Sequence, residues 1–383
     1  MNDTNRIRVL IAGDYCPYGR VKQLIEEDKG NSIFDDVQGI IQESDLSVVN
    51  FECSVEAPNS TKITKHGESL RCSAKSVELM KKVGFDIVTL ANNHFYDYGD
   101  SGVKNTLRCL NENQIDYVGG GENLCEASRI LYKSVKGQTI AFINCCENEF
   151  SIATKDHGGS NPLNPIIQFY DIQEARKNAD IVIIIVHGGY EHYPYPSPRM
   201  KETYHFFVDA GADVVVNGHQ HCYSGHEVYK EKPIFYGLGN FCFDWKVKDL
   251  KPWHWGYMVE LDIDADQQIS FVLHPYIQCY TSPSLKLLDS EQSQSFKAKL
   301  QDINRIIADD QELQTKLNSL ATNNALAYTV DYEPYNHRFF RALFTRHLLP
   351  SMVGRKKMLH AYNHLICESH RDILLSVIKQ KLI

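Results

Sequence analysis

The chain has 383 residues, of which 43% are hydrophobic and 23% are charged. This composition, without a low-complexity tract or a repeat of fixed period, excludes a disordered or repeat-built main body. The formal net charge of −8 is uneven, because residues 336–383 carry nine Lys or Arg against two acids, or +7, and the remainder carries −15. We expect the basic tail to dock on the acidic body, on a partner or on an anionic surface.

Short apolar runs alternate with helical patterns along most of the chain. Runs rich in Val and Ile predict strands, covered on both faces, over residues 7–12, 46–51, 87–90, 140–144, 181–186 and 214–217. Helices are predicted over 73–83, 102–112 and 198–210, each near a Gly or Asn stop signal. Lys136-Gly137 predicts a hairpin over 130–143, and further strands are predicted over 227–229, 234–236, 257–262 and 269–278. The order of elements indicates an α/β fold.

After residue 283 the sequence changes character. Helix-forming residues predominate as far as residue 322 and again from 337 to the end, with Pro334, Pro350 and Gly354 as breaks. We therefore expect one α/β domain over residues 1–283 and a helical C-terminal extension over 284–383.

The chain carries few signals for export or oxidation. The apolar stretch after Arg8 is too short for a signal peptide, and no window approaches the roughly 18 apolar residues of a membrane span. Eleven cysteines without a C-x-x-C pair favour reduced thiols. These features predict a cytoplasmic protein without a membrane span.

Polar and histidine-containing motifs follow the predicted strands. They are Gly13-Asp14, Asn50-Phe51-Glu52, Ala91-Asn92-Asn93-His94, His187-Gly188-Gly189 and Gly218-His219-Gln220-His221. Side chains that follow strands of an open α/β sheet gather at one edge. A pair of divalent ions needs a bridging carboxylate, and borderline ions prefer imidazole for their other positions. The motifs therefore predict a site for one or two divalent ions, with Mn, Zn, Fe and Mg all open.

The order of these motifs (acid, acid, Asn-His, His, His-x-His) resembles the calcineurin-like metallophosphoesterase superfamily. With Asn50-x-Glu52 and Gly239-Asn240-Phe241-x-Phe243-Asp244 added, residues 7–280 resemble its CapA, or poly-γ-glutamate capsule biosynthesis, branch. The resemblance implies a β-sandwich flanked by helices and a metal-dependent site. It also implies six metal ligands, namely Asp14, Glu52, Asn93, His187, His219 and His221.

The resemblance divides these ligands between two ions. Asn93, His187 and His219 would share one ion, and His221 would bind the other. Asp14 would ligate or bridge both ions, and Glu52 would stand where the superfamily has a bridging Asp. A water that bridges two cations loses a proton near neutral pH and becomes the nucleophile.

His94 is better placed as a catalytic acid than as a ligand. An imidazole beside a ligating Asn can protonate a leaving group or stabilise developing charge. Asp97, three residues on, is predicted to orient it.

Four residues are candidates for substrate contact: Glu191, Asn240, Asp244 and Trp245. Each has a simpler alternative, since Glu191 lies in a polar loop, Asn240 and Asp244 flank a turn, and Trp245 begins a cluster of tryptophans.

The first motif departs from the superfamily. Classical members have Asp-x-His there, but this chain has Asp14-Tyr15-Cys16, a departure that the resemblance to the capsule branch leads us to expect. Cys16 either replaces the missing imidazole as a thiolate or is simply buried. In the second case one ion is held loosely, is replaced by Mg²⁺ or Mn²⁺, or is absent.

Three functions remain open. The leading hypothesis is a metal-dependent hydrolase acting on a phosphoester or an amide-linked polymer in capsule or exopolymer biosynthesis. The second is an epimerase-like proton transfer by Asp14, Glu52 and His94, with metal optional. The third is a non-catalytic assembly factor of a synthase complex that docks through its basic C-terminal helices. Nucleic acid is not an expected partner, because the body is acidic and the basic tail has no recognisable nucleic-acid-binding motif.

Overall fold

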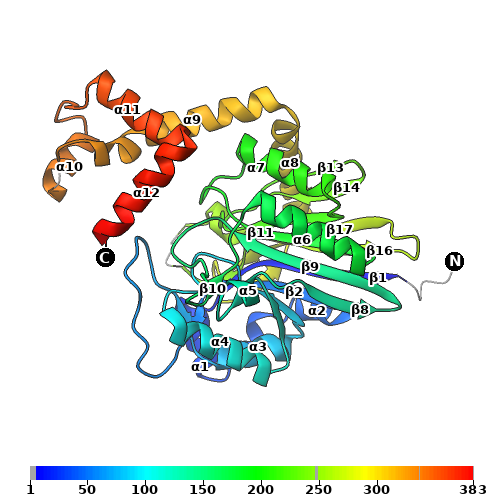
Figure 1. Ribbon diagram of the computed structural model, residues 1–383. Coiled ribbons are helices and arrows are strands. Elements are labelled where there is room, and N and C mark those ends of the chain that lie inside the picture. The colour runs from blue at the N-terminus through cyan, green and yellow to red at the C-terminus, as the bar shows by residue number, and fades with distance from the viewer. Residues whose placement is uncertain (1–5, 246–248, 336, 383) are drawn as a thin grey trace. The chain divides into compact units, whose positions relative to one another are not determined.

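The computed structural model describes residues 6–245, 249–335 and 337–382 (Figure 1). Contacts divide the chain into two compact units, Met1–Leu313 and Gln314–Ile383. The sequence predicts a boundary at residue 283 instead. The difference comes from helix α8 (Ser290–Ala308), because its buried Phe296 and Leu300 belong to the core of the first unit.

The first unit contains an eight-stranded sheet in the order β18-β17-β16-β1-β2-β5-β6, with β15 also paired to β1. Its strands are β1 (Ile7–Cys16), β2 (Leu46–Phe51), β5 (Ile87–Thr89), β6 (Asp116–Val118), β15 (Asn240–Phe243), β16 (Trp255–Ile263), β17 (Ile269–Gln278) and β18 (Leu285–Leu287). Strands β1, β2, β5, β6 and β15 run parallel, so their carboxyl ends share one edge.

A six-stranded sheet has the order β13-β14-β12-β11-β9-β8. Its strands are β8 (Leu131–Val135), β9 (Gln138–Cys146), β11 (Ile181–His187), β12 (Val214–Gly218), β13 (His226–Tyr229) and β14 (Lys232–Phe235). Strands β9, β11, β12 and β14 are parallel. The predicted hairpin is confirmed as the antiparallel pair β8–β9, which turns at Lys136-Gly137.

The two sheets pack face to face and bury one apolar layer between them. Val9 and Val48 of the eight-stranded sheet lie in the same cluster as Ile183 and Val216 of the six-stranded sheet. This arrangement explains the continuous Val and Ile runs, since each strand is covered on both faces.

Helices cover the outer faces (Figure 1). Helices α1 (Gly19–Glu26), α2 (Gln38–Glu43), α3 (Lys75–Val83) and α4 (Gly99–Glu112) pack on the eight-stranded sheet. Helices α6 (Pro165–Asn178) and α7 (Pro198–Asp209) pack on the six-stranded sheet. The predicted α/β sandwich flanked by helices is confirmed, although α6 was not among the predicted helices.

Short elements complete the first unit. They are β3 (Ser54–Val55), β4 (Arg71–Cys72), β7 (Gly120–Gly121), β10 (Gly159–Ser160), α5 (Leu124–Ala127), η2 (Gly30–Ile33) and η3 (Pro252–His254).

The predicted C-terminal helices are present. Helix α9 (Asp310–Thr329) carries the boundary between the units and is followed by η4 (Val330–Tyr332), α10 (Arg338–Thr345), α11 (Arg355–Ile366) and α12 (Glu368–Leu382). Within the second unit, Glu333 accepts hydrogen bonds from Ser351 and from the Met352 backbone. Among the described residues, no helix combines the length and the apolar content that crossing a bilayer requires.

Candidate metal centre

The six predicted ligands meet at the carboxyl ends of the parallel strands. The eight-stranded sheet brings Asp14 near the end of β1, Glu52 after β2 and Asn93 after β5. The six-stranded sheet brings His187 at the end of β11 and the pair His219 and His221 after β12. The predicted gathering of these side chains is therefore observed.

The turn after β12 holds its two histidines in unusual backbone conformations. His219 and His221 have φ angles of 96° and 53°, in the left-handed region that residues with a side chain seldom adopt. The turn also approaches β1 closely, because a Cβ atom at Gly218 would lie 2.9 Å from Asp14 Oδ1. Both features bring the two imidazoles toward the carboxylates of the other sheet.

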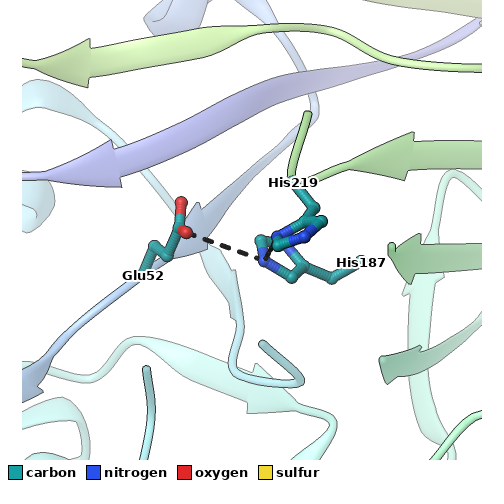
Figure 2. A group of neighbouring side chains, drawn as sticks. All are labelled: Glu52, His187 and His219. Carbon is teal, nitrogen blue, oxygen red and sulfur yellow. Dashed lines mark hydrogen bonds and ion pairs between the residues drawn. The ribbon is translucent and has the colours of Figure 1, made fainter. Parts of the chain in front are cut away.

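Two groups of potential ligand atoms form, and Glu52 belongs to both. One group contains Glu52, His187 and His219, and the other contains Asp14, Glu52 and His221 (Figure 2 shows the first). Glu52 Oε1 lies 3.7 Å from Nε2 of both His187 and His221. The division of the histidines follows the prediction. The shared carboxylate, however, is Glu52, whereas the resemblance gave Asp14 a bridging position as well.

Asn93 and His219 both contact His187. Asn93 Oδ1 and His219 Nδ1 each lie 3.2 Å from His187 Nε2. The first group thus has a fourth potential ligand in the amide oxygen of Asn93.

The environment of Glu52 suits a cation. Its side chain is fully buried, and neither carboxylate oxygen has a hydrogen-bond partner among the described residues. An isolated buried carboxylate is costly unless it is paired, protonated or bound to a metal. Imidazole and carboxylate together form a donor set that Mn, Zn or Fe binds well. The residues present therefore fit one or two divalent ions.

Burial shifts the pKa values of the two kinds of ligand in opposite directions. It raises the pKa of Asp14 to about 6, against the opposing hydrogen bonds from Asn50 and the His219 backbone. Burial and the negative charge of Asp14 raise the pKa of Glu52 well above its usual range. Burial also lowers the pKa of His187 and His221 well below the usual value. The two imidazoles are consequently neutral near pH 7 and offer lone pairs to an ion.

Asn50 and Asn240 contact three of the candidate ligand residues and orient their side chains. The Asn50 amide nitrogen lies 2.8 Å from Asp14 Oδ1, to which it donates, and 3.2 Å from His187 Nδ1. Asn240 Oδ1 lies 2.9 Å from His221 Nδ1, so that a proton on Nδ1 leaves Nε2 free to face Glu52. Asn240 is fully buried and contacts the candidate ligand His221, and it is absent from the described lining of the large cavity near His94.

His94 lies beside the ligands in a network of its own. Its Nδ1 lies 2.7 Å from Asp97 Oδ2, as predicted for an orienting carboxylate. Lys65, which sequence reasoning missed, forms an ion pair with Asp97 and lies 3.2 Å from His94 Nδ1. Lys65 sits in a loop without regular structure, so no periodicity or motif pointed to it.

A cavity of about 900 Å³ opens beside this network. Its lining includes Asn93, His94 and His221 together with the predicted contacts Glu191 and Trp245. Trp245 stacks on Tyr18 with ring centroids 4.8 Å apart. Two of the four predicted substrate contacts therefore face a space large enough for a substrate.

Asp244 has a different environment. Its carboxylate pairs with the Arg20 guanidinium at 2.8 Å and accepts a hydrogen bond from the Arg20 backbone at 2.6 Å. It is absent from the described lining of the cavity. The contacts show Asp244 fixing the start of α1, and its predicted contact with substrate has no support from them.

Cys16 is buried, and burial raises the pKa of its thiol. It belongs to neither ligand group formed by the described residues. Cys16 is thus a buried thiol rather than a replacement ligand. Among the described residues, the position of the missing imidazole stays without a nitrogen ligand.

Comparisons with the sequences of known proteins agree with the motifs. The capsule biosynthesis protein CapA of Bacillus anthracis is 34% identical over 250 residues, which cover 63% of this chain and 61% of that protein. The poly-γ-glutamate (PGA) biosynthesis protein CapA of Bacillus subtilis is 38% identical over 231 residues, covering 59% and 60%. The chain thus matches less than two thirds of the length of these relatives. A phosphatase from Mycoplasma pneumoniae aligns with a TM-score of 0.43 at 16% identity, over 77% of this chain and 99% of that one.

The family model described as bacterial capsule synthesis protein PGA_cap matches residues 8–245. This range includes every predicted ligand, both positioning asparagines and the His94 network. The chain therefore belongs to the PGA_cap family of bacterial capsule synthesis proteins.

Proposed function

We propose that the protein is a metal-dependent hydrolase of the metallophosphoesterase type that acts on a phosphoester or an amide-linked polymer. The observation that carries this proposal is the Glu52 carboxylate, which is buried without a hydrogen-bond partner and shared by two groups of ligands. The neighbouring imidazoles supply no positive charge at neutral pH, because burial keeps them neutral, and Lys65 acts on the carboxylate less strongly than burial does. A divalent cation satisfies both conditions.

The proposed ligands would hold one ion at Glu52, His187, His219 and Asn93, and a second at Asp14, Glu52 and His221. A divalent ion bound there supplies Lewis acidity and lowers the pKa of a coordinated water.

His94 is the group of this chain best placed to move a proton. Asp97 accepts from Nδ1 and thereby fixes the ring, which leaves Nε2 as the nitrogen available to a leaving group. Lys65 pairs with the same Asp97 carboxylate and therefore fixes the orientation of that carboxylate.

The cavity supports a substrate larger than a phosphate ion. Its volume of about 900 Å³ lies in the range of sites for extended small molecules or polymer segments. Trp245 and Trp253 give it apolar walls, and Lys65 and Lys251 give it positive groups. The names of the two CapA relatives favour a polymer of the capsule as the substrate.

The test is turnover by protein purified without chelator, with its metal content measured, against phosphoesters and γ-glutamyl peptides. We expect hydrolysis that chelation abolishes and that added Mn²⁺ or Zn²⁺ restores. His94→Ala should lower turnover by about 10²- to 10⁴-fold with metal content unchanged. The matched control is His274→Ala, since His274 pairs with Glu260 on strands β16 and β17.

Loss of metal in proportion to activity in His94→Ala would make His94 a ligand. Failure of every metal-loaded preparation to hydrolyse either class, together with metal-independent exchange of solvent deuterium into a substrate, would replace the hydrolase by a proton-transfer enzyme.

A further inference from the structure

The helices of the second unit leave apolar faces uncovered. Helices α11 and α12 bury no side chain, although both are rich in large apolar residues. On α11, Leu359, Tyr362 and Ile366 follow the spacing of one helical face, with exposed fractions of 57%, 62% and 52%. On α12, Leu375, Ile378 and Leu382 do the same. Short helices of this kind gain most of their stability from covering such a face, so a partner is expected.

Basic side chains lie opposite the apolar faces of α10 and α11, whereas on α12 Arg371 lies four residues before Leu375 and shares its face. On α11, Lys357, His360 and His364 follow one helical spacing opposite the apolar face. On α10, Arg338 and Arg341 lie opposite Phe339 and Leu343. Over residues 336–383, nine Lys or Arg stand against two acids. The surface is thus apolar and cationic at once.

This combination favours a lipid surface over a protein. Protein interfaces are depleted of lysine, whereas each Lys or Arg near an anionic bilayer contributes about 1 kcal/mol to binding. Helices with one apolar face and a Lys- and Arg-rich polar face lie in the plane of the membrane interface. The family match ends at residue 245, so membership of the family does not account for this segment.

We propose that helices α10, α11 and α12 form a membrane-binding surface that rests on anionic phospholipid headgroups with its apolar side chains among the acyl chains. This inference is independent of the hydrolase proposal, because it involves none of the ligands.

The test is co-sedimentation of the full chain with vesicles of phosphatidylcholine mixed with phosphatidylglycerol, and with vesicles of phosphatidylcholine alone. We expect binding to the mixed vesicles that added salt weakens, and little binding to the neutral ones. Lys356→Gln with Lys357→Gln should weaken binding by about 20- to 30-fold, since two charges are lost. Leu359→Ser with Ile366→Ser should abolish it.

The matched control is Ile166→Ser with Ile167→Ser, which removes two exposed apolar side chains from α6 of the first unit and should leave binding unchanged. Circular dichroism checks that the helices persist in each variant. Equal binding to both kinds of vesicle, or no binding to either, would overturn the proposal. A doubled mass in light scattering that Leu359→Ser with Ile366→Ser abolishes, without vesicle binding, would assign the surface to a second copy of the chain.

Discussion

The two sheets contribute different chemistry to the same site. The eight-stranded sheet supplies oxygen atoms from Asp14, Glu52 and Asn93, whereas the six-stranded sheet supplies the three imidazoles. Neither set is complete alone, because burial disfavours the charged form of the carboxyl groups, and the imidazoles, which burial keeps neutral, supply no positive charge to offset it. The site therefore depends on the apolar layer between the sheets, which sets the distance between its two halves.

The halves also differ in how burial affects them. Burial favours the protonated carboxyl groups on one side and the neutral imidazoles on the other. A bound cation favours the deprotonated form of both. Substitutions on the two sides should therefore fail in distinguishable ways.

The largest effect is expected from Glu52→Gln. Because Glu52 belongs to both ligand groups, both ions should bind more weakly by more than about 100-fold. This loss exceeds the one typical of changing a residue that only supports a ligand. Metal analysis and calorimetric titration measure this.

The same variant should not weaken the metal-free fold. The raised pKa of Glu52 means that the metal-free parent loses stability as pH rises above the ordinary carboxyl range, and a neutral amide lacks this dependence. Thermal unfolding of metal-free Glu52→Gln at neutral pH should occur at or above the parent's temperature. A marked fall would show that Glu52 supports the fold rather than an ion.

The next effect compares His221→Ala with His219→Ala. His221 is the single imidazole of its group, whereas His187 remains when His219 is lost. His221→Ala should empty one position, while His219→Ala should only weaken the other, because borderline ions bind poorly without nitrogen ligands. Metal content per chain decides, and equal loss of both ions from each variant would refute the asymmetry.

A smaller effect is expected from changes to the two asparagines that contact the ligand residues. Asn50→Ala should weaken the binding of both ions by about 10- to 100-fold, since Asn50 contacts Asp14 and His187. Asn240→Ala should affect only the ion near His221, which it contacts. Titration with Mn²⁺ separates the two variants. Identical losses at both positions in Asn240→Ala would mean that it disturbs the sheet instead of one ligand.

The smallest effect concerns a carboxyl group outside the site. Asp171 on α6 has an oxygen without a hydrogen-bond partner among the described residues, and burial raises its pKa to about 6. Because the folded-state pKa exceeds the unfolded one, the parent should lose stability between about pH 4 and pH 7. Asp171→Asn should flatten this part of the unfolding profile. Unlike Glu52→Gln, it should leave the stabilisation by added metal unchanged.

Sequence patterns predicted the strands and the gathering of polar side chains at their ends, whereas the resemblance supplied the set of six ligands. A Val and Ile run that is followed by Asp, Glu or His marks the carboxyl end of a strand, and the parallel topology then brings these ends together. The runs before Glu52 and His187 show both features, and the six ligand side chains accordingly meet in the structure.

Contacts between distant segments could not be predicted in this way. Lys65 pairs with Asp97 from an irregular loop. Arg20 forms an ion pair with Asp244, which lies 224 positions away in the sequence. Helix α6 begins with exposed Ile166 and Ile167, so its apolar residues do not form one buried face. Helix α8 belongs to the first unit because its apolar face completes the core, which only tertiary packing reveals.

Anomalous diffraction from crystals of the chain soaked in Mn²⁺ tests the central claim most directly. The account predicts an ion at roughly 2.0–2.3 Å, ordinary ligand distances, from Glu52, His187 and His219. A second, more weakly occupied ion is predicted beside Asp14, Glu52 and His221. Absence of anomalous density at Glu52, with Mn²⁺ bound elsewhere or not at all, would contradict it.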